Sequence, residues 1–216
     1  LEEGVIKTTD SFECTGYLHV GDWDIKCTAY RRGGHGWLNV QESLMQSCNV
    51  AMMRMGAMIG RERFAKYQSI FGFGDKTGID LPGEADTSGL VHTADDMGPT
   101  DLATIAFCQN YNCTMVQMAA AFCSVLNGGS YYEPHVVKQI LNEQGSVVEK
   151  KEPVLVRETV SRSTSDFLKE AMFQTVEVGT GKAAQVAGYD VGGKTGTAEK
   201  QPRSAKNYLV SFAGFA

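Results

Sequence analysis

The sequence predicts an α+β fold in which helices dominate and a sheet lies at the C-terminal end. Apolar residues recur at helical spacing in several segments between residues 40 and 178. Near the end of the chain, Gly188–Ala198 and Asn207–Ala216 read as two strands joined by a polar loop. The chain has 216 residues, 43% of them hydrophobic and 21% charged, which suits one domain with a buried core.

The first helix is expected to begin at Asn39, whose side chain can cap it because Glu42 follows at capping-box spacing. It should break around Ser47-Cys48-Asn49, since serine and asparagine side chains compete for backbone hydrogen bonds. A second helix is then expected to run through Met52 to Gly60. A third should cover Arg61–Phe71.

Glycine and proline mark the loops that follow. Gly72–Gly89 is expected to be a loop, because it contains the turn signals Gly74-Asp75 and Pro82-Gly83. The remaining elements are expected to be the helices Thr100–Phe107 and Thr114–Asn127, a hairpin of Val136–Leu141 with Ser146–Glu149, and the helix Ser163–Val178.

The six cysteines include no Cys-x-x-Cys pair, so their spacing argues against a zinc site. Cys14 and Cys27 flank Gly16–Lys26, which reads as a hairpin, and a disulfide between them is an open alternative for an exported domain. The histidines are scattered without ligand spacing: His19, His35, His92 and His135. We therefore expect neither a metal nor a cofactor.

Charge and hydropathy exclude two classes of protein. The net charge is −5 and the pI is near 5.4, whereas a nucleic-acid-binding protein needs a basic face. The longest apolar run, around Met115–Leu126, is about a dozen residues and too short to cross a bilayer.

Two short motifs carry candidate chemistry, Ser47-Cys48-Asn49 at the helix break and Lys194-Thr195-Gly196-Thr197 on a strand. A serine that transfers acyl groups must lose a proton, which later reaches the leaving amine. A hydroxyl such as Ser47 beside a cation such as Lys194 can relay that proton. Asn49 can donate and accept hydrogen bonds, so it can hold a substrate amide and a lysine at once.

The strand motif offers further groups to a substrate. Gly196 leaves the strand edge bare, so a peptide can pair with it as an added strand. Thr197 offers a hydroxyl for a carboxylate and a backbone N–H for an oxyanion. Together with Thr195, these residues form the candidate substrate-binding set.

Two rival motifs are not expected to be functional. A second Lys-Thr-Gly triplet begins at Lys76 between turn signals, so Lys76 is expected to be a solvated loop lysine. Gly188–Thr195 also matches the phosphate-binding loop pattern Gly-x4-Gly-Lys-Thr. Such a loop must open a helix, whereas Gly196 and Pro202 follow here.

The sequence resembles the transpeptidase domain of class B penicillin-binding proteins, the division, elongation and sporulation type, over nearly its whole length. Ser-x-Asn and Lys-Thr-Gly are two of the three motifs of these enzymes. The matching segments, in family order, are Leu1–Ile6, Gly34–Gly36, Ser47–Asn49, Phe71–Gly74, Thr77–Glu84, Gln117–Ala121, Asn127–Gly129, Pro134-His135, Gly179–Gly181 and Gly193–Ala198.

The resemblance implies the penicillin-binding-protein transpeptidase and serine β-lactamase-like fold, here a helical subdomain with part of the antiparallel sheet. It implies an enzyme at the extracytoplasmic face of the bacterial cell membrane, attached by an anchor outside this chain. Such enzymes cross-link peptidoglycan stem peptides at a D-alanyl-D-alanine bond through an acyl-serine intermediate. β-Lactam antibiotics trap that serine, and other cell-wall synthesis proteins are the implied partners. Ser47, Asn49 and Lys194 would be catalytic, with Thr195, Gly196 and Thr197 at the substrate.

One element of the family pattern is missing. No serine in the sequence has a lysine three residues on, so the nucleophile motif Ser-x-x-Lys is expected to precede Leu1. Residues 1–216 would then be a partial transpeptidase domain, truncated at both ends and inactive by itself. One alternative is a nucleophile-less scaffold module of a cell-wall synthesis complex. Another is a serine β-lactamase, which would need a deacylating general base.

Overall fold

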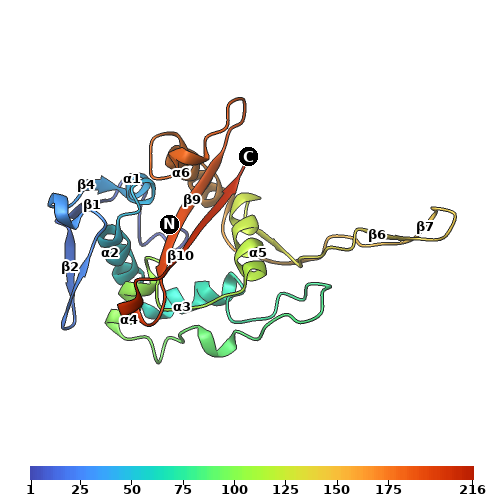
Figure 1. The fold of residues 1–216 in the computed structure, drawn as a ribbon, viewed down its shortest axis with the longest axis horizontal. Coiled ribbons are helices and arrows are strands. Elements are labelled where there is room, and N and C mark those ends of the chain that lie inside the picture. The colour runs from blue at the N-terminus through green and yellow to red at the C-terminus, as the bar shows by residue number, and fades with distance from the viewer. The chain divides into compact units, whose positions relative to one another are not determined.

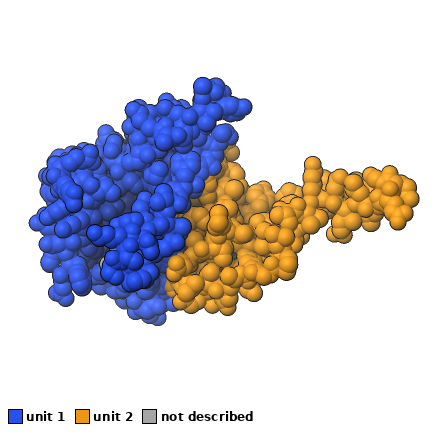
Figure 2. All heavy atoms as spheres, viewed as in Figure 1, with its two compact units in different colours: residues 1–65, 92–111, 166–216 blue, residues 66–91, 112–165 orange. Residues whose placement is uncertain are grey.

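The computed structural model describes the backbone of residues 1–216 and every side chain except that of Arg203. The chain forms two compact units, shown in different colours in Figure 2. Unit 1 comprises Leu1–Ala65, His92–Tyr111 and Asp166–Ala216, and unit 2 comprises Lys66–Val91 and Asn112–Ser165. The mixture of helices with antiparallel strand pairs confirms the predicted α+β class (Figure 1).

The helices of unit 1 begin and end close to where the sequence predicts. Asn39 caps α1, because its side chain accepts a hydrogen bond from the Glu42 amide at 2.8 Å and its own amide donates to the Glu42 carboxylate at 2.8 Å. The predicted break at Ser47 is confirmed, and α2 begins at Asn49. The helices with residues in this unit are α1 (Val40–Met45), α2 (Asn49–Ile59), α3 (Arg61–Ile70), α4 (Pro99–Ile105) and α6 (Arg162–Glu177).

The strands of unit 1 form three antiparallel pairs. The predicted hairpin at Gly16–Lys26 is confirmed as the second pair below, and the two C-terminal strands as the third. The sequence did not predict the first pair. The pairs are β1 (Ser11–Cys14) with β4 (Gly36–Asn39), β2 (Tyr17–Val20) with β3 (Trp23–Lys26), and β9 (Gly192–Glu199) with β10 (Tyr208–Phe215). Short 3-10 helices lie at Tyr30–Arg32, Lys182–Ala184 and Arg203–Ala205.

The core of unit 1 forms where α2 packs against α4 and against strand β1. Val50, Ala51 and Met53 line the buried face of α2. Three cysteines belong to the same core: Cys14, Cys27 and Cys48. The apolar contacts therefore fix the start of α2, which carries the candidate residue Asn49.

Unit 2 is built around α5 (Met115–Leu126). Thr114 caps this helix, since its hydroxyl accepts a hydrogen bond from the Gln117 amide at 3.0 Å. The predicted loop is confirmed, with one 3-10 turn at Ser88–Leu90. The hairpin of β6 (Gln139–Leu141) and β7 (Val147–Lys150) extends away from the rest of unit 2 (Figure 1), whereas the pair β5 (Ser130–Tyr132) and β8 (Leu155–Glu158) was not predicted. Within the described residues, no helix combines the length and apolarity that a bilayer crossing requires.

Candidate functional site

The Ser47-Cys48-Asn49 segment forms the tight connection between α1 and α2. Ser47 has a φ of 51°, the left-handed region that a side chain adopts at a cost of about 1–3 kcal/mol. Two backbone bonds hold this turn: the Ser47 amide donates to the Leu44 carbonyl at 3.1 Å, and the Cys48 amide donates to the Ser43 carbonyl at 3.0 Å. These two bonds therefore fix the backbone position of Ser47.

Lys194 lies on β9 and reaches this turn. Its amine donates one hydrogen bond to the Ser47 hydroxyl and another to the Thr195 carbonyl at 2.8 Å. Burial lowers the pKa of Lys194, because desolvation disfavours the ammonium form. The structure thus brings Ser47 and Lys194 together. A proton can be transferred in either direction between the Ser47 hydroxyl and the Lys194 amine.

Asn49 is the first residue of α2, and its side chain contacts the end of a neighbouring strand. Its side-chain amide donates to the Lys26 carbonyl at 3.1 Å, which ties the start of α2 to the end of β3. The described hydrogen bond of Asn49 therefore goes to backbone and not to a lysine side chain. The amide oxygen still offers an acceptor to a substrate.

Strand β9 carries Thr195, Gly196 and Thr197. The backbone N–H and C=O groups of successive residues point to opposite edges of a strand, so those of Gly196 face one edge and those of Thr195 and Thr197 share the other. Gln109 contacts that edge: its side-chain amide donates to the Thr197 carbonyl at 3.1 Å and accepts from the Glu199 amide at 3.4 Å. Sequence reasoning missed Gln109, since no local pattern links it to a strand that is about ninety residues away.

Gly196 has a neighbour of its own within the sheet. It pairs with Ser211 of β10, and a Cβ built at Gly196 would lie 2.5 Å from the Ser211 hydroxyl oxygen. A hydroxyl can rotate away, so this contact alone does not demand glycine.

Thr180 joins the two segments that carry Ser47 and Lys194. Its amide and its hydroxyl both donate to the Met45 carbonyl at 3.1 Å, two residues before Ser47. The same hydroxyl lies 3.3 Å from the Thr195 hydroxyl. The sequence marked Gly179–Gly181 by resemblance but assigned no role to Thr180.

The rival motifs take the structures that the sequence predicts. Lys76 is exposed in the loop of unit 2, outside any strand. Lys194 and Thr195 lie within β9, which continues to Glu199, so no helix follows the phosphate-loop pattern. A nucleotide site is therefore excluded at this position.

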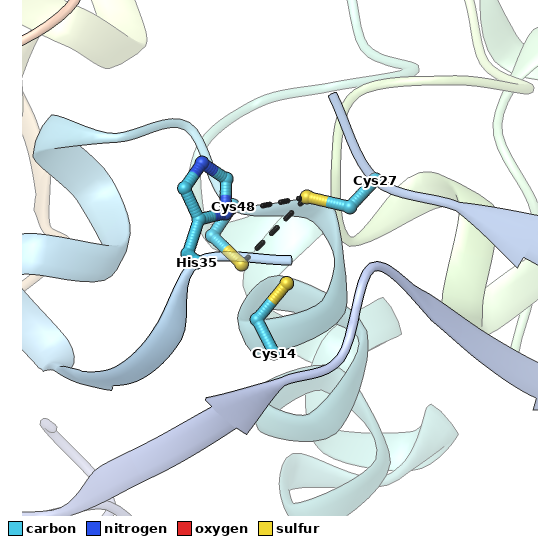
Figure 3. A group of neighbouring side chains, drawn as sticks. All are labelled: Cys14, Cys27, His35 and Cys48. Atoms are coloured by element: carbon cyan, nitrogen blue, oxygen red, sulfur yellow. Dashed lines mark hydrogen bonds between the residues drawn. The ribbon is translucent and has the colours of Figure 1, made fainter. Parts of the chain in front are cut away.

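A group of cysteines lies beside the Ser47 turn. No described cysteine forms a disulfide, so Cys14 and Cys27 are not bonded to each other. Instead Cys27 Sγ lies 3.8 Å from Cys48 Sγ and 3.5 Å from His35 Nδ1 (Figure 3). Hydrogen bonding between the two thiols lowers the pKa of Cys27 and raises that of Cys48. The sequence spacing, which argued against a metal site, did not foresee this cluster.

Comparison with known proteins gives consistent matches. The family described as penicillin binding protein transpeptidase domain matches residues 1–216. Stage V sporulation protein D of Bacillus subtilis is 37% identical over 219 residues, which cover 100% of this chain and 33% of that protein. Peptidoglycan D,D-transpeptidase MrdA of Acinetobacter baumannii is 25% identical over 218 residues, which cover 96% of this chain and 32% of that protein. The chain thus spans about a third of the length of these curated relatives.

A solved structure matches the whole chain. Penicillin-binding protein 3 of Mycobacterium tuberculosis, complexed with aztreonam, superimposes with a TM-score of 0.83 at 25% identity. The match covers 100% of this chain and 50% of that one. The arrangement of helices and antiparallel strands described above is therefore shared with that structure.

Proposed function

This chain belongs to the penicillin-binding protein transpeptidase family, and from that membership we propose that the complete protein carrying it is a class B peptidoglycan D,D-transpeptidase. In this proposal the protein cross-links stem peptides through an acyl-serine intermediate. This chain supplies the second and third active-site motifs. The nucleophile comes from a Ser-x-x-Lys segment, which the printed sequence does not contain.

The observation that carries the proposal is the hydrogen bond from Lys194 to Ser47. When the nucleophilic serine attacks the D-alanyl carbonyl, a C–O bond forms, the C–N bond breaks, and the lysine of the Ser-x-x-Lys segment takes up the proton of the attacking serine. Ser47 passes its hydroxyl proton to the departing amine and regains one from Lys194. When the acceptor amine attacks, a new C–N bond forms and the C–O bond breaks. The amine proton then passes through Ser47 back to Lys194, and the lysine of the Ser-x-x-Lys segment returns its proton to the nucleophilic serine. The lowered pKa of Lys194 suits this exchange, since burial destabilises the ammonium form and makes the proton easier to release.

The edge of β9 is the proposed peptide-binding surface. A stem peptide would pair with the edge that carries Thr195 and Thr197, beside the bare backbone of Gly196. The Thr197 amide would donate to the oxyanion, and its hydroxyl would bind the substrate carboxylate. Gln109 closes the same edge beyond Thr197 through its hydrogen bond to the Thr197 carbonyl, so it would mark the end of the peptide site. Asn49 would accept from the substrate amide.

Two related proteins support the substrate and the inhibitors that we propose. One relative is named a peptidoglycan D,D-transpeptidase, and a structural neighbour is a complex with the β-lactam aztreonam. These matches support peptidoglycan stem peptides as substrate and β-lactams as inhibitors of the complete protein. We place the complete protein at the extracytoplasmic face of the membrane, among other cell-wall synthesis proteins, because stem peptides are cross-linked there.

The test is the rate at which a fluorescent penicillin acylates the complete protein. Lys194→Ala should slow acylation by about 100-fold or more, because it removes the proton partner of Ser47. The matched control is Lys76→Ala, which changes the other Lys-Thr-Gly triplet and should leave the rate unchanged. Equal rates for Lys194→Ala and wild type would contradict the proposal.

The same experiment separates the two alternatives. A scaffold module without a nucleophile would not be acylated in any variant. A β-lactamase would rapidly hydrolyse the acyl-serine bond and release the drug. A transpeptidase should keep the acyl group bound for much longer. The lifetime of the labelled protein therefore distinguishes these functions.

A further inference from the structure

Gln109 is presented to β9 by a loop whose backbone is strained. The loop follows α4, and its residues Cys108 and Asn110 have φ angles of 71° and 68°. This left-handed region is uncommon for residues other than glycine, although asparagine adopts it more readily than most. Gln109 lies between these two residues, and its backbone amide donates to the Thr104 carbonyl at 3.0 Å. Further contacts are therefore needed to hold the loop in this conformation.

The side chain of Asn110 supplies two such contacts. Its amide nitrogen donates to Asp101 Oδ1 at 2.9 Å and to His92 Nε2 at 3.3 Å. The second carboxylate oxygen of Asp101 accepts from the Gly98 amide at 3.1 Å, immediately before α4. The loop after α4 is thus joined to the segment before it, and all of these residues belong to unit 1.

The contacts of Asn110 have a single consistent assignment of protons. The amide nitrogen uses both of its hydrogen atoms, so His92 Nε2 is an acceptor and the proton of the neutral imidazole lies on Nδ1. That proton is directed at Asp96, whose Oδ1 lies 3.2 Å from His92 Nδ1. In the opposite orientation the Asn110 oxygen would face the Asp101 carboxylate, and two acceptors do not bond to each other. The network thus fixes both the side chain of Asn110 and the tautomer of His92.

The same loop meets the edge of β9 that carries the backbone groups of Thr195 and Thr197. The Gln109 side chain donates to the Thr197 carbonyl and accepts from the Glu199 amide. An added strand that continued along this edge would pair with the same two backbone groups, so the Gln109 amide occupies the position of a strand partner. The placement of Gln109 therefore limits how far a bound peptide pairs along this edge.

We propose that His92, Asn110 and Asp101 form a positioning clamp, which holds Gln109 against β9 and thereby fixes the end of the peptide site. The proposed function places none of the three at the reacting atoms, so they position Gln109 and do not take part in the chemistry. The effect of the clamp on substrate or drug binding rests on the proposed function. Its effect on the edge of β9 does not.

The first test is hydrogen exchange of the Glu199 amide in the complete protein, resolved to single residues. Asn110→Gly removes the side chain but favours the left-handed backbone, so it separates the clamp from the conformation of the loop. We expect exchange about 3-fold faster in this variant, and no further increase when Asn110→Gly is added to Gln109→Ala. Unchanged exchange in Asn110→Gly would overturn the proposal, as would an equal increase in both backgrounds.

The controls separate the clamp from a general loosening of the structure. Asn112→Ala changes an exposed asparagine two positions further along and should leave Glu199 exchange unchanged. Exchange at Glu199 is compared in every variant with that of Ala171, which is buried in α6. If Asn112→Ala accelerates Glu199 exchange as much as Asn110→Gly does, the clamp is not what holds Gln109.

His92 gives a second and independent readout. His92→Gln keeps an acceptor for Asn110 and should retain the protection of Glu199, whereas His92→Leu removes the acceptor and should accelerate exchange by about 2-fold. In wild-type protein, the chemical shifts of the ring nitrogens should show the proton of the neutral imidazole on Nδ1. A proton on Nε2 would overturn the network, as would equal exchange in the glutamine and leucine variants.

Acylation of the complete protein by benzylpenicillin tests the effect of the clamp on binding. Its kinetics give a dissociation constant for the initial complex and a rate constant for the covalent step. Asn110→Gly should raise the dissociation constant by about 5-fold and change the rate constant by less than about 2-fold, because the clamp acts on the edge of β9 and not on the reacting groups. A rate constant that falls by as much as the affinity or more, or no change in either constant, would overturn this role. If wild-type protein is never acylated, the proposed function fails, while the exchange of Glu199 still decides the clamp.

Discussion

The amine of Lys194 donates a hydrogen bond to the hydroxyl of Ser47, although 147 positions separate the two residues in the sequence. One residue sits on a strand near the end of the chain, and the other in a left-handed turn between two helices. Thr180 joins the same two segments a second time, through the Met45 carbonyl and the Thr195 hydroxyl. The segments that carry Ser47 and Lys194 are therefore held together by two sets of contacts, the Lys194–Ser47 hydrogen bond and the contacts of Thr180.

The protonation of Lys194 should respond to its burial. Because burial lowers its pKa, competitive amine labelling as a function of pH should give Lys194 a midpoint below the ordinary value for lysine. The unfolded chain keeps this proton to higher pH than the folded chain. The free energy of unfolding, measured relative to Lys194→Met, should therefore increase as pH rises between the folded and the unfolded pKa. A decrease over that window would contradict the assignment.

Thr180 should act as a positioning residue. Thr180→Val removes the hydroxyl that contacts the Met45 carbonyl, and we expect about 1 kcal/mol lower free energy of unfolding and acylation slowed by about 10-fold. Thr180→Ser keeps the hydroxyl and should restore the acylation rate. If the serine variant is as slow as the valine variant, the hydroxyl is not the group that matters.

Gln109 should protect the edge of β9. Gln109→Ala removes the acceptor of the Glu199 amide, whose hydrogen exchange should accelerate by about 5-fold. Gln109→Glu keeps this acceptor while losing the donor to the Thr197 carbonyl, so Glu199 should stay protected. Gln144→Ala, in the exposed β6–β7 turn, is the control. Equal exchange in the alanine and glutamate variants would show that Gln109 does not hold this edge.

Glu84 should make unit 2 sensitive to acid. Burial raises the pKa of Glu84, but hydrogen bonds from the Thr77 hydroxyl, the Thr77 amide and the Gly78 amide outweigh it, so the pKa lies below the ordinary value. The stability that Glu84 contributes is present above the unfolded pKa and is lost as pH falls through the folded pKa.

Glu84→Gln removes this charge and is expected to lower the free energy of unfolding by about 1 kcal/mol at neutral pH. The difference from wild type should vanish in acid, where Glu84 is protonated. Chemical denaturation across the acid range measures both effects, with Glu143→Gln in the exposed β6–β7 turn as the control. A difference that does not depend on pH would contradict the role of the charge.

Local signals in the sequence predicted much of this structure. The capping boxes of Asn39 with Glu42 and of Thr114 with Gln117 act within one helical turn, so their spacing identifies the helix starts directly. Ser47-Cys48-Asn49 was located because serine and asparagine disrupt helices locally. Lys194 was distinguished from Lys76 because turn signals surround the latter.

The missed features all depend on pairing between distant segments. The strand Ser11–Cys14 is four residues long and pairs with Gly36–Asn39, so neither stretch is long enough to show a period of its own. The cluster of Cys14, Cys27, His35 and Cys48 exists only after that pairing forms. The contact of Gln109 with β9 likewise depends on the tertiary fold, so neither the composition nor the spacing of residues in the sequence predicts it.

The most direct test of the central claim is the intact mass after incubation with benzylpenicillin, measured side by side on residues 1–216 and on the complete protein. The account predicts that the complete protein gains one drug mass and that residues 1–216 gain none, since no serine in this chain has a lysine three residues on. Acylation of residues 1–216 would contradict the site assignment, and no acylation of the complete protein would contradict the transpeptidase function.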